Sequence, residues 1–192
     1  MLVSRGEEER CCYFTDDTVM TLAVAQAIID WRTNGSGGMA DLSAAAVSRM
    51  QEFGRRYPHA GYGGAFCRWL EASRPHPYNS WGNGAAMRVS ACGWAGRTLD
   101  EVKELSRAGY SFDVSCQGSV PQALEAFFES TSFEDAVRNA ISIGGDSDTI
   151  GAICGAVAEA FYGVPDEIRA KAMTFLPKHL LAVLDRAESV FC

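Results

Sequence analysis

Apolar residues recur at helical spacing along nearly the whole chain. Residues 18–31 are apolar around most of their circumference, which is typical of a helix buried among other helices. A second, alanine-rich helix should follow Asp41 and stop near Gly54 and Pro58. Helical patterns also cover residues 98–108, 119–130, 132–142 and 147–162. Pro177 should divide the remaining C-terminal residues into two helices, because proline disrupts a helix interior.

Strand-like alternation is scarce, since only residues 110–115 alternate and they are few enough to be an extended loop. Ser119 and Ser132 each stand directly before a helical pattern, where their side chains should act as N-caps. No repeat, low-complexity segment or linker divides the sequence. We therefore predict an all-α fold in a single domain over residues 13–192, preceded by a flexible polar leader at residues 1–12.

The size and charge of the chain narrow its class. A chain of 192 residues can bury a core as one domain. Its 24 acidic residues exceed its 17 basic residues, and Arg55-Arg56 is the longest basic run, so non-specific nucleic-acid binding is not expected. The most apolar stretch, residues 149–164, contains Glu159 and is too short to span a bilayer.

Seven cysteines do not suggest a disulfide framework. Their number is odd, and no two have the C-x-x-C spacing of zinc or redox sites. The first ten residues contain no apolar signal-peptide region. We therefore expect a cytoplasmic protein with reduced thiols. His59, His76 and His179 are far apart in sequence, so we expect surface or packing roles for them.

Two acidic segments, residues 15–18 and 144–149, stand directly before buried helices. Helix capping is one interpretation, because Asp, Ser and Thr are favoured N-cap residues and acids suit the positive end of a helix. A cap needs only one side-chain acceptor, however, and each segment supplies two acids and at least one hydroxyl. Like charges placed together favour a bound cation, and oxygen ligands select Mg²⁺, Mn²⁺ or Ca²⁺. Two such segments, far apart in sequence, predict a shared dinuclear metal site.

A glycine-rich segment at residues 79–88 is the third candidate. Gly82 and Gly84 allow close approach of the backbone, and Asn83 tolerates a left-handed conformation. Exposed N–H groups at the start of the helix that follows would cradle a phosphate. An ordinary turn is the alternative, because Asn-Gly pairs commonly mark turns. Residues 60–64 are also rich in glycine and are likewise compatible with a turn.

Four segments share their residues and their order with one known family. They are residues 14–20 (FTDDTVM), 79–88 (NSWGNGAAMR), 112–124 (FDVSCQGSVPQAL) and 142–163 (SIGGDSDTIGAICGAVAEAFYG). Together they resemble the ADP-ribosylglycohydrolase family. The resemblance implies an all-α orthogonal helical bundle with a binuclear Mg²⁺ or Mn²⁺ centre in a cleft. It also implies hydrolysis of the N- or O-glycosidic bond that joins ADP-ribose to a protein side chain or a small acceptor.

The same resemblance implies roles for individual residues. The implied metal ligands, for two ions, are Thr15, Asp16, Asp17, Asp146, Asp148 and Thr149. The implied catalytic residues are Asp16, Asp17 and Asp148. The implied substrate-binding residues are Asn79, Ser80, Trp81, Gly82, Asn83, Gly84, Ala85 and, near the adenosine end, Val114. The implied partner is an ADP-ribosylated protein or small molecule, with no role for a membrane.

The sequence departs from the family pattern in two places. The usual first helix, with its G-D-x-x-G-like motif, has no counterpart before Tyr13. A second helical segment, which the family usually has between the segments that correspond to residues 79–88 and 112–124, is also missing. That segment often carries a histidine near the ligand, and no histidine lies between Arg88 and Ser119. A family member that binds ADP-ribose without catalysis, or has a structural role, is therefore the alternative to an active hydrolase. A metal-dependent phosphohydrolase or prenyl-diphosphate enzyme is a third hypothesis, although the sequence lacks a D-D-x-x-D pattern at Asp16-Asp17.

Overall fold

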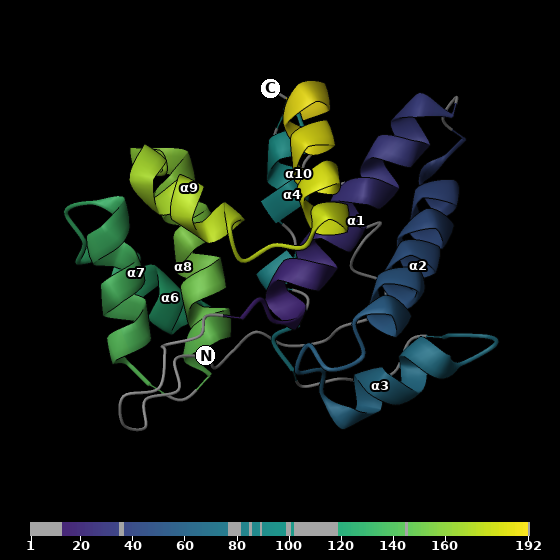
Figure 1. The fold of residues 1–192 in the computed structure, drawn as a ribbon, viewed down its shortest axis with the longest axis horizontal. Helices are drawn as coiled ribbons and strands as arrows, with labels where there is room; N and C mark the ends of the chain where they lie inside the picture. Colours follow the sequence, from purple (N-terminus) through teal and green to yellow (C-terminus); the bar gives the residue numbers. More distant parts are fainter. Residues whose placement is uncertain are drawn as a thin grey trace.

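The predicted all-α class is confirmed over the part of the chain that the computed structural model describes. That part comprises residues 13–34, 37–76, 82–84, 86–88, 90–98, 101, 119–144 and 146–191. Every regular element in these ranges is a helix (Figure 1). The predicted leader at residues 1–12 and the alternating segment at residues 110–115 lie outside them, as does most of the helix predicted at residues 98–108.

One hydrophobic core forms around helix α1 (Asp16–Thr33), which is apolar on nearly every side as its sequence predicts. Helices α2 (Met39–Arg56), α4 (Ser90–Ala95) and α10 (Lys178–Phe191) pack against it, and α3 (Gly64–Glu71) packs against α2. The short 3-10 helix η1 (Ala86–Arg88) also contacts α1. The largest side chains of this core are fully buried: Phe53, Met20, Ile28, Leu42, Met50 and Leu180. Such burial of large apolar groups is the main stabilising contribution to this half of the structure.

A second core joins α6 (Val120–Phe128), α7 (Phe133–Ser142) and α8 (Ser147–Tyr162). Most of its buried residues are small: Ala123, Ala126, Ala136, Ala140, Cys154 and Ala158. Helix α9 (Asp166–Met173) follows α8 and buries none of its own residues. In Figure 1 this green group of helices lies beside the purple, blue and yellow group built on α1. The contacts between the groups run chiefly through α1, η1 and α8.

Several predicted boundaries are confirmed. Helix α8 begins at Ser147 and ends before Gly163, which has a φ of 73° that favours glycine. The Ser132 hydroxyl accepts a hydrogen bond of 3.2 Å from the Asp135 N–H, so this residue is the N-cap of α7 as predicted. Pro177 lies between α9 and α10, where we expected the C-terminal region to divide.

Helix α2 ends at Arg56, between Gly54 and Pro58 as predicted, but it begins at Met39, before Asp41, and Gly54 lies inside it. A Cβ at Gly54 would lie 2.5 Å from Leu70 Cδ2, so this glycine permits close packing of α3 rather than stopping α2. Ser119 stands at the N-cap position of α6, but its side chain makes no capping hydrogen bond.

A turn closed by the hydrogen bond from the Ala60 N–H to the Tyr57 carbonyl precedes the glycine-rich residues, which are irregular up to the start of α3 at Gly64. His59 and His76 are exposed, while the His179 ring packs 4.8 Å from the Phe53 ring centroid. The expected surface and packing roles of the histidines are therefore confirmed. No helix within the described ranges is both long and apolar enough to cross a membrane.

Candidate functional site

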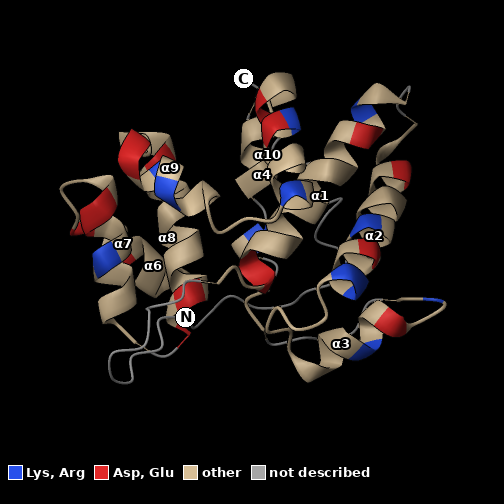
Figure 2. Cartoon of the chain, viewed as in Figure 1, with Lys and Arg blue, Asp and Glu red and all other residues tan. Residues whose placement is uncertain are grey.

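Three helices, α1, α3 and α8, begin beside one cavity of about 380 Å³. Its lining combines acidic residues with glycine-rich backbone: Asp16, Gly63, Gly64, Ala65, Phe66, Gly82, Asn83, Gly84, Met87, Arg88, Asp146 and Thr149. Figure 2 shows acidic residues at the lower ends of α1 and α8, where each helix starts. Helix N-termini carry partial positive charge, so this end of the fold suits anionic groups.

The start of α1 is fixed by hydrogen bonds that do not cap the helix. Thr15 stands at its N-cap position, yet the Thr15 hydroxyl donates to Asp17 Oδ2 at 2.9 Å instead of accepting from the helix backbone. The Asp16 N–H donates to the Ala60 carbonyl at 2.8 Å, which ties α1 to the turn before α3. Helix capping therefore does not explain the acidic segment at residues 15–18.

The start of α8 shows the same departure from capping. Asp146 stands at the N-cap position, but its side chain accepts no hydrogen bond from the α8 backbone. Asp146 Oδ2 accepts a hydrogen bond of 2.6 Å from Asn83 Nδ2, which also donates to Ser119 Oγ at 2.6 Å. One amide group thus joins the glycine-rich loop to the starts of α6 and α8. The Ser119 hydroxyl serves this loop, which is why it does not cap α6.

The two acidic segments lie close enough to change each other's ionisation. The pKa of Asp16 is raised from 3.8 to about 6, mainly because the carboxyl group is buried. Repulsion from Asp17 also raises this pKa, and Asp148 and Asp146 contribute in the same direction. Residues 130 positions apart in sequence therefore meet at one site, as the sequence analysis predicted.

Asp17 is the most deeply buried of these acids, with 6% of its surface exposed. Burial raises its pKa, repulsion from Asp148 and Asp146 raises it further, and the hydroxyls of Thr15 and Thr149 lower it. Its Oδ1 atom is buried and accepts no hydrogen bond from any residue that the structure describes. A buried carboxylate oxygen without a partner is costly, and a cation beside it would remove that cost.

The donor set fits a hard divalent cation, but the described side chains do not form a finished coordination shell. Carboxylate and hydroxyl oxygens are the ligands that Mg²⁺ and Mn²⁺ prefer. Within the described ranges, no three His, Cys, Asp or Glu residues form a group that could hold a metal ion. Coordination by several of these carboxylates would require their side chains to turn toward one another.

The structure brings together many of the residues implied by the family resemblance, although not all of them reach the same cavity. Six of them line it: Asp16, Gly82, Asn83, Gly84, Asp146 and Thr149. Asp17 lines an adjoining cavity of about 270 Å³, which shares Met87 with the first. Asp148 is exposed on the first turn of α8. The implied residues Asn79, Ser80, Trp81, Ala85 and Val114 lie outside the described ranges.

The other six residues of the lining were not predicted as site residues, and Arg88 and Phe66 have the largest side chains among them. Arg88 is 4% exposed, and its guanidinium carbon lies 5.8 Å from the centroid of the Phe66 ring. A buried cation on the wall of this cavity complements an anionic ligand such as a diphosphate. Arg88 ends the glycine-rich segment at residues 79–88, and an arginine next to the apolar Met87 was the signal that could have revealed it.

Comparison with known proteins agrees with the four motifs. No curated protein sequence matches the chain significantly. The family model described as ADP-ribosylglycohydrolase matches residues 4–113 and residues 96–190, which together cover most of the sequence. The matched residues include the starts of α1 and α8 and the glycine-rich loop between them. From its sequence and from the helices that carry its acidic segments, this chain belongs to the ADP-ribosylglycohydrolase family.

Proposed function

We propose that this protein hydrolyses the glycosidic bond between ADP-ribose and an acceptor, which is a protein side chain or a small molecule. Its family membership supports a hydrolase of this type. The observation that carries the proposal is the meeting of the acidic starts of α1 and α8 with the glycine-rich loop and Arg88. The carboxyl groups of Asp16 and Asp146 therefore line the same cavity as Arg88, whose positive charge would bind the diphosphate. Cys67 and Cys154 are not in disulfides within the described residues, which suits the cytoplasm as the place of action.

The proposed cofactor is Mg²⁺ or Mn²⁺, in two ions. The residues that would hold them are Thr15, Asp16, Asp17, Asp146, Asp148 and Thr149. The unpartnered Oδ1 of Asp17 and the mutual repulsion of the aspartates support this assignment. When bound, such ions neutralise the carboxylates, polarise substrate oxygens and lower the pKa of a bound water.

The residues of the chain itself supply binding and proton transfer. The backbone at Gly82 and Gly84 permits close approach of a diphosphate, while Arg88 and the start of α3 at Gly64 attract its charge. We assign the role of general acid or base to Asp16, which lines the cavity, with Asp17 and Asp148 as the other catalytic acids. Burial raises the pKa of Asp16 to about 6 in the metal-free protein, and a bound cation would lower it.

The test is release of ADP-ribose from arginine- or serine-modified substrates with Mg²⁺ present. The Asp16→Asn and Asp148→Asn variants should each lose roughly 100-fold or more of the activity, the range expected when a general acid or base is removed. Asp41→Asn, which changes an exposed acid in the first turn of α2, is the matched control and should keep full activity. Activity that persists in EDTA, or in both site variants, would contradict the metal-dependent mechanism.

Asn83→Ala should weaken binding of ADP-ribose without removing any acid. Asn83 Nδ2 joins Ser119 Oγ to Asp146 Oδ2, and a net contribution of about 1–1.5 kcal/mol from these hydrogen bonds corresponds to roughly tenfold in affinity. Calorimetric titration measures the change, and Asn34→Ala at the exposed end of α1 is the control. Equal affinity of Asn83→Ala and the parent would show that this bridge does not shape the site.

A second candidate function is binding of ADP-ribose without turnover. The observation in its favour is that no three acids within the described ranges are grouped as metal ligands. A protein of this kind would show calorimetric binding of ADP-ribose and no release of ADP-ribose from any modified substrate. Measurable hydrolysis that Asp148→Asn abolishes would exclude it.

A further inference from the structure

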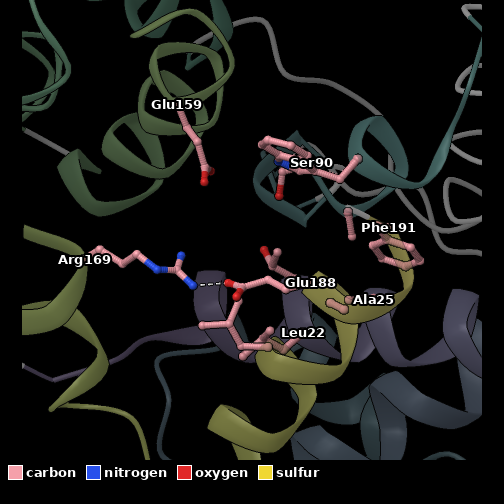
Figure 3. A pocket seen from close by; sticks show the side chains of 12 residues that line it. Leu22, Ala25, Ser90, Glu159, Arg169, Glu188 and Phe191 are labelled. Carbon is pink, nitrogen blue, oxygen red and sulfur yellow. Dashed lines mark hydrogen bonds and ion pairs between the residues drawn. The ribbon is translucent and has the colours of Figure 1, made fainter. Parts of the chain in front are cut away.

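A larger cavity, of about 550 Å³, lies between helices from both cores and shares no lining residue with the acidic cavity. Figure 3 shows the side chains that line it, which come from α1, α4, α8, α9 and α10. Leu22 and Ala25 form the wall on α1, and Leu184 and Phe191 form the wall on α10. Trp94, which is 46% exposed, adds an aromatic surface from α4. The volume is within the range of sites for small molecules, roughly 300–1,000 Å³.

Three ionisable side chains face this apolar space, and their charges do not balance. Arg169 donates a hydrogen bond to Glu188, and the two form an ion pair that Figure 3 marks with a dashed line. The side chain of Glu159, from α8, has no ion pair or hydrogen bond with the described residues and is directed into the same space. When all three groups are ionised, the positive charge of Arg169 balances only one of the two glutamates, and the cavity has a net charge of about −1.

The surroundings of Glu159 make that extra charge costly. The residue is half-buried, and burial raises the pKa of its carboxyl group. The nearby Glu188 raises this pKa further, while Arg169 lowers it. A carboxylate in an apolar cavity gains most from a cation that brings its own apolar surface, because the ligand then satisfies the charge and fills the space.

We propose that this cavity binds a small organic cation, an ammonium or guanidinium group on an alkyl or aryl body, with the cation on Glu159. The apolar body of the ligand lies against Leu22, Ala25, Leu184 and Phe191, and Trp94 adds aromatic surface to the lining. An anion is disfavoured, because Arg169 already pairs with Glu188 and the remaining charge is negative. A neutral ligand of the same shape leaves Glu159 uncompensated. This site contains none of the acids assigned to hydrolysis, although Leu22 and Glu159 also line the cavity of about 270 Å³ that Asp17 reaches.

The experiment is calorimetric titration of the full chain at pH 8 with phenethylammonium, 2-phenylethanol and 3-phenylpropionate. These probes have similar bodies and are cationic, neutral and anionic, respectively. We expect saturable one-to-one binding of the cation, at least about tenfold tighter than binding of the alcohol, and no binding of the anion. Absence of saturable binding, equal affinity for cation and alcohol, or preference for the anion would overturn the proposal.

Two variants assign the binding to this cavity. Glu159→Gln keeps the shape and removes the charge, so it should weaken cation binding about tenfold or more. Glu125→Gln, an exposed change of the same kind on α6, should leave binding unchanged. Ala187→Phe should block binding by filling the cavity while leaving Glu159 in place, and far-ultraviolet circular dichroism checks that each variant is folded. Parent-like affinity in folded Glu159→Gln or Ala187→Phe would disprove the assignment.

Discussion

Replacing Asp16 by asparagine should stabilise the metal-free protein at high pH and leave its stability almost unchanged at low pH. The Asp16 carboxyl stands at the start of α1, where burial and three neighbouring aspartates oppose its ionisation. Asparagine is nearly the same size and carries no charge at any pH. The comparison therefore isolates the free energy that the folded protein loses when this one group ionises.

The magnitude follows from the shifted pKa. The pKa of Asp16 is about 6 in the folded protein, against an ordinary value of 3.8 that describes the unfolded chain. This difference corresponds to about 3 kcal/mol. Below pH 4 the group is protonated in both states and costs nothing. Between pH 4 and 6 the folded state binds more protons than the unfolded state, so stability falls as the pH rises. Well above pH 6 the loss of stability is complete, and without solvent screening it would be about 3 kcal/mol. Asp16 is partly exposed to solvent, so we expect a loss of about 1–3 kcal/mol.

The assay is urea unfolding in EDTA at several pH values between 4 and 8. Asp16→Asn should exceed the parent by about 1–3 kcal/mol at pH 8, and the difference should shrink to about 0.5 kcal/mol or less near pH 4. Asp41→Asn is the control, because Asp41 also lies in the first turn of a helix but is exposed. That control loses a favourable interaction with the helix dipole and should be destabilised by about 0.3–1 kcal/mol at pH 8.

Two results would refute this reasoning. One is an Asp16→Asn variant that is no more stable than the parent at pH 8 in EDTA. The other is a stability difference that has the same size at pH 4 and pH 8, since only an ionisation difference between folded and unfolded states varies with pH in this window.

Three further predictions concern the stability of helices away from the site. Ser132→Ala should lower the free energy of unfolding by about 1 kcal/mol in urea unfolding, because Ser132 Oγ caps the Asp135 N–H, and an unchanged midpoint would show that this cap is dispensable. Gly54→Ala should destabilise by about 1–3 kcal/mol, since the new Cβ meets Leu70 at 2.5 Å. Gly93→Ala, with nothing within 4 Å of its Cβ, should instead stabilise α4 by about 0.5–1 kcal/mol in the same assay. Equal effects at the two glycines would contradict the packing argument.

The fold was predictable from sequence where local signals agreed with packing. Helix α8 is mostly apolar after its first turn and is bounded by Asp146 and Gly163, so both of its ends follow from the chain itself. Helix α3 was missed because it starts at a glycine and buries only Trp69 and Leu70. The packing role of Gly54 was missed because its neighbour across the fold, Leu70, cannot be identified from local sequence.

The same division holds for the site. The proximity of the two acidic segments was predictable, because carboxylates next to buried helices are costly unless a cation neutralises them, and one site can serve both segments. The bridge from Asn83 to Ser119 and Asp146 was not predictable, since it joins three segments whose distance depends on the packing of α6 and α8. The place of Arg88 in the cavity wall depends on the same packing, together with the turn before α3.

The aspartates of α1 and α8 belong to helices that pack in different hydrophobic cores, so a ligand bound to both helix starts would hold the two cores together. A molecule that touches both helix starts acts as a crosslink between two bodies that otherwise meet chiefly through α1, η1 and α8. Part of its intrinsic affinity is then offset by the entropy of fixing one body against the other. A covalent link between α1 and α8 away from the cavity should therefore increase ligand affinity without adding a single contact to the ligand. The same link would make the two cores melt together, as one cooperative unit.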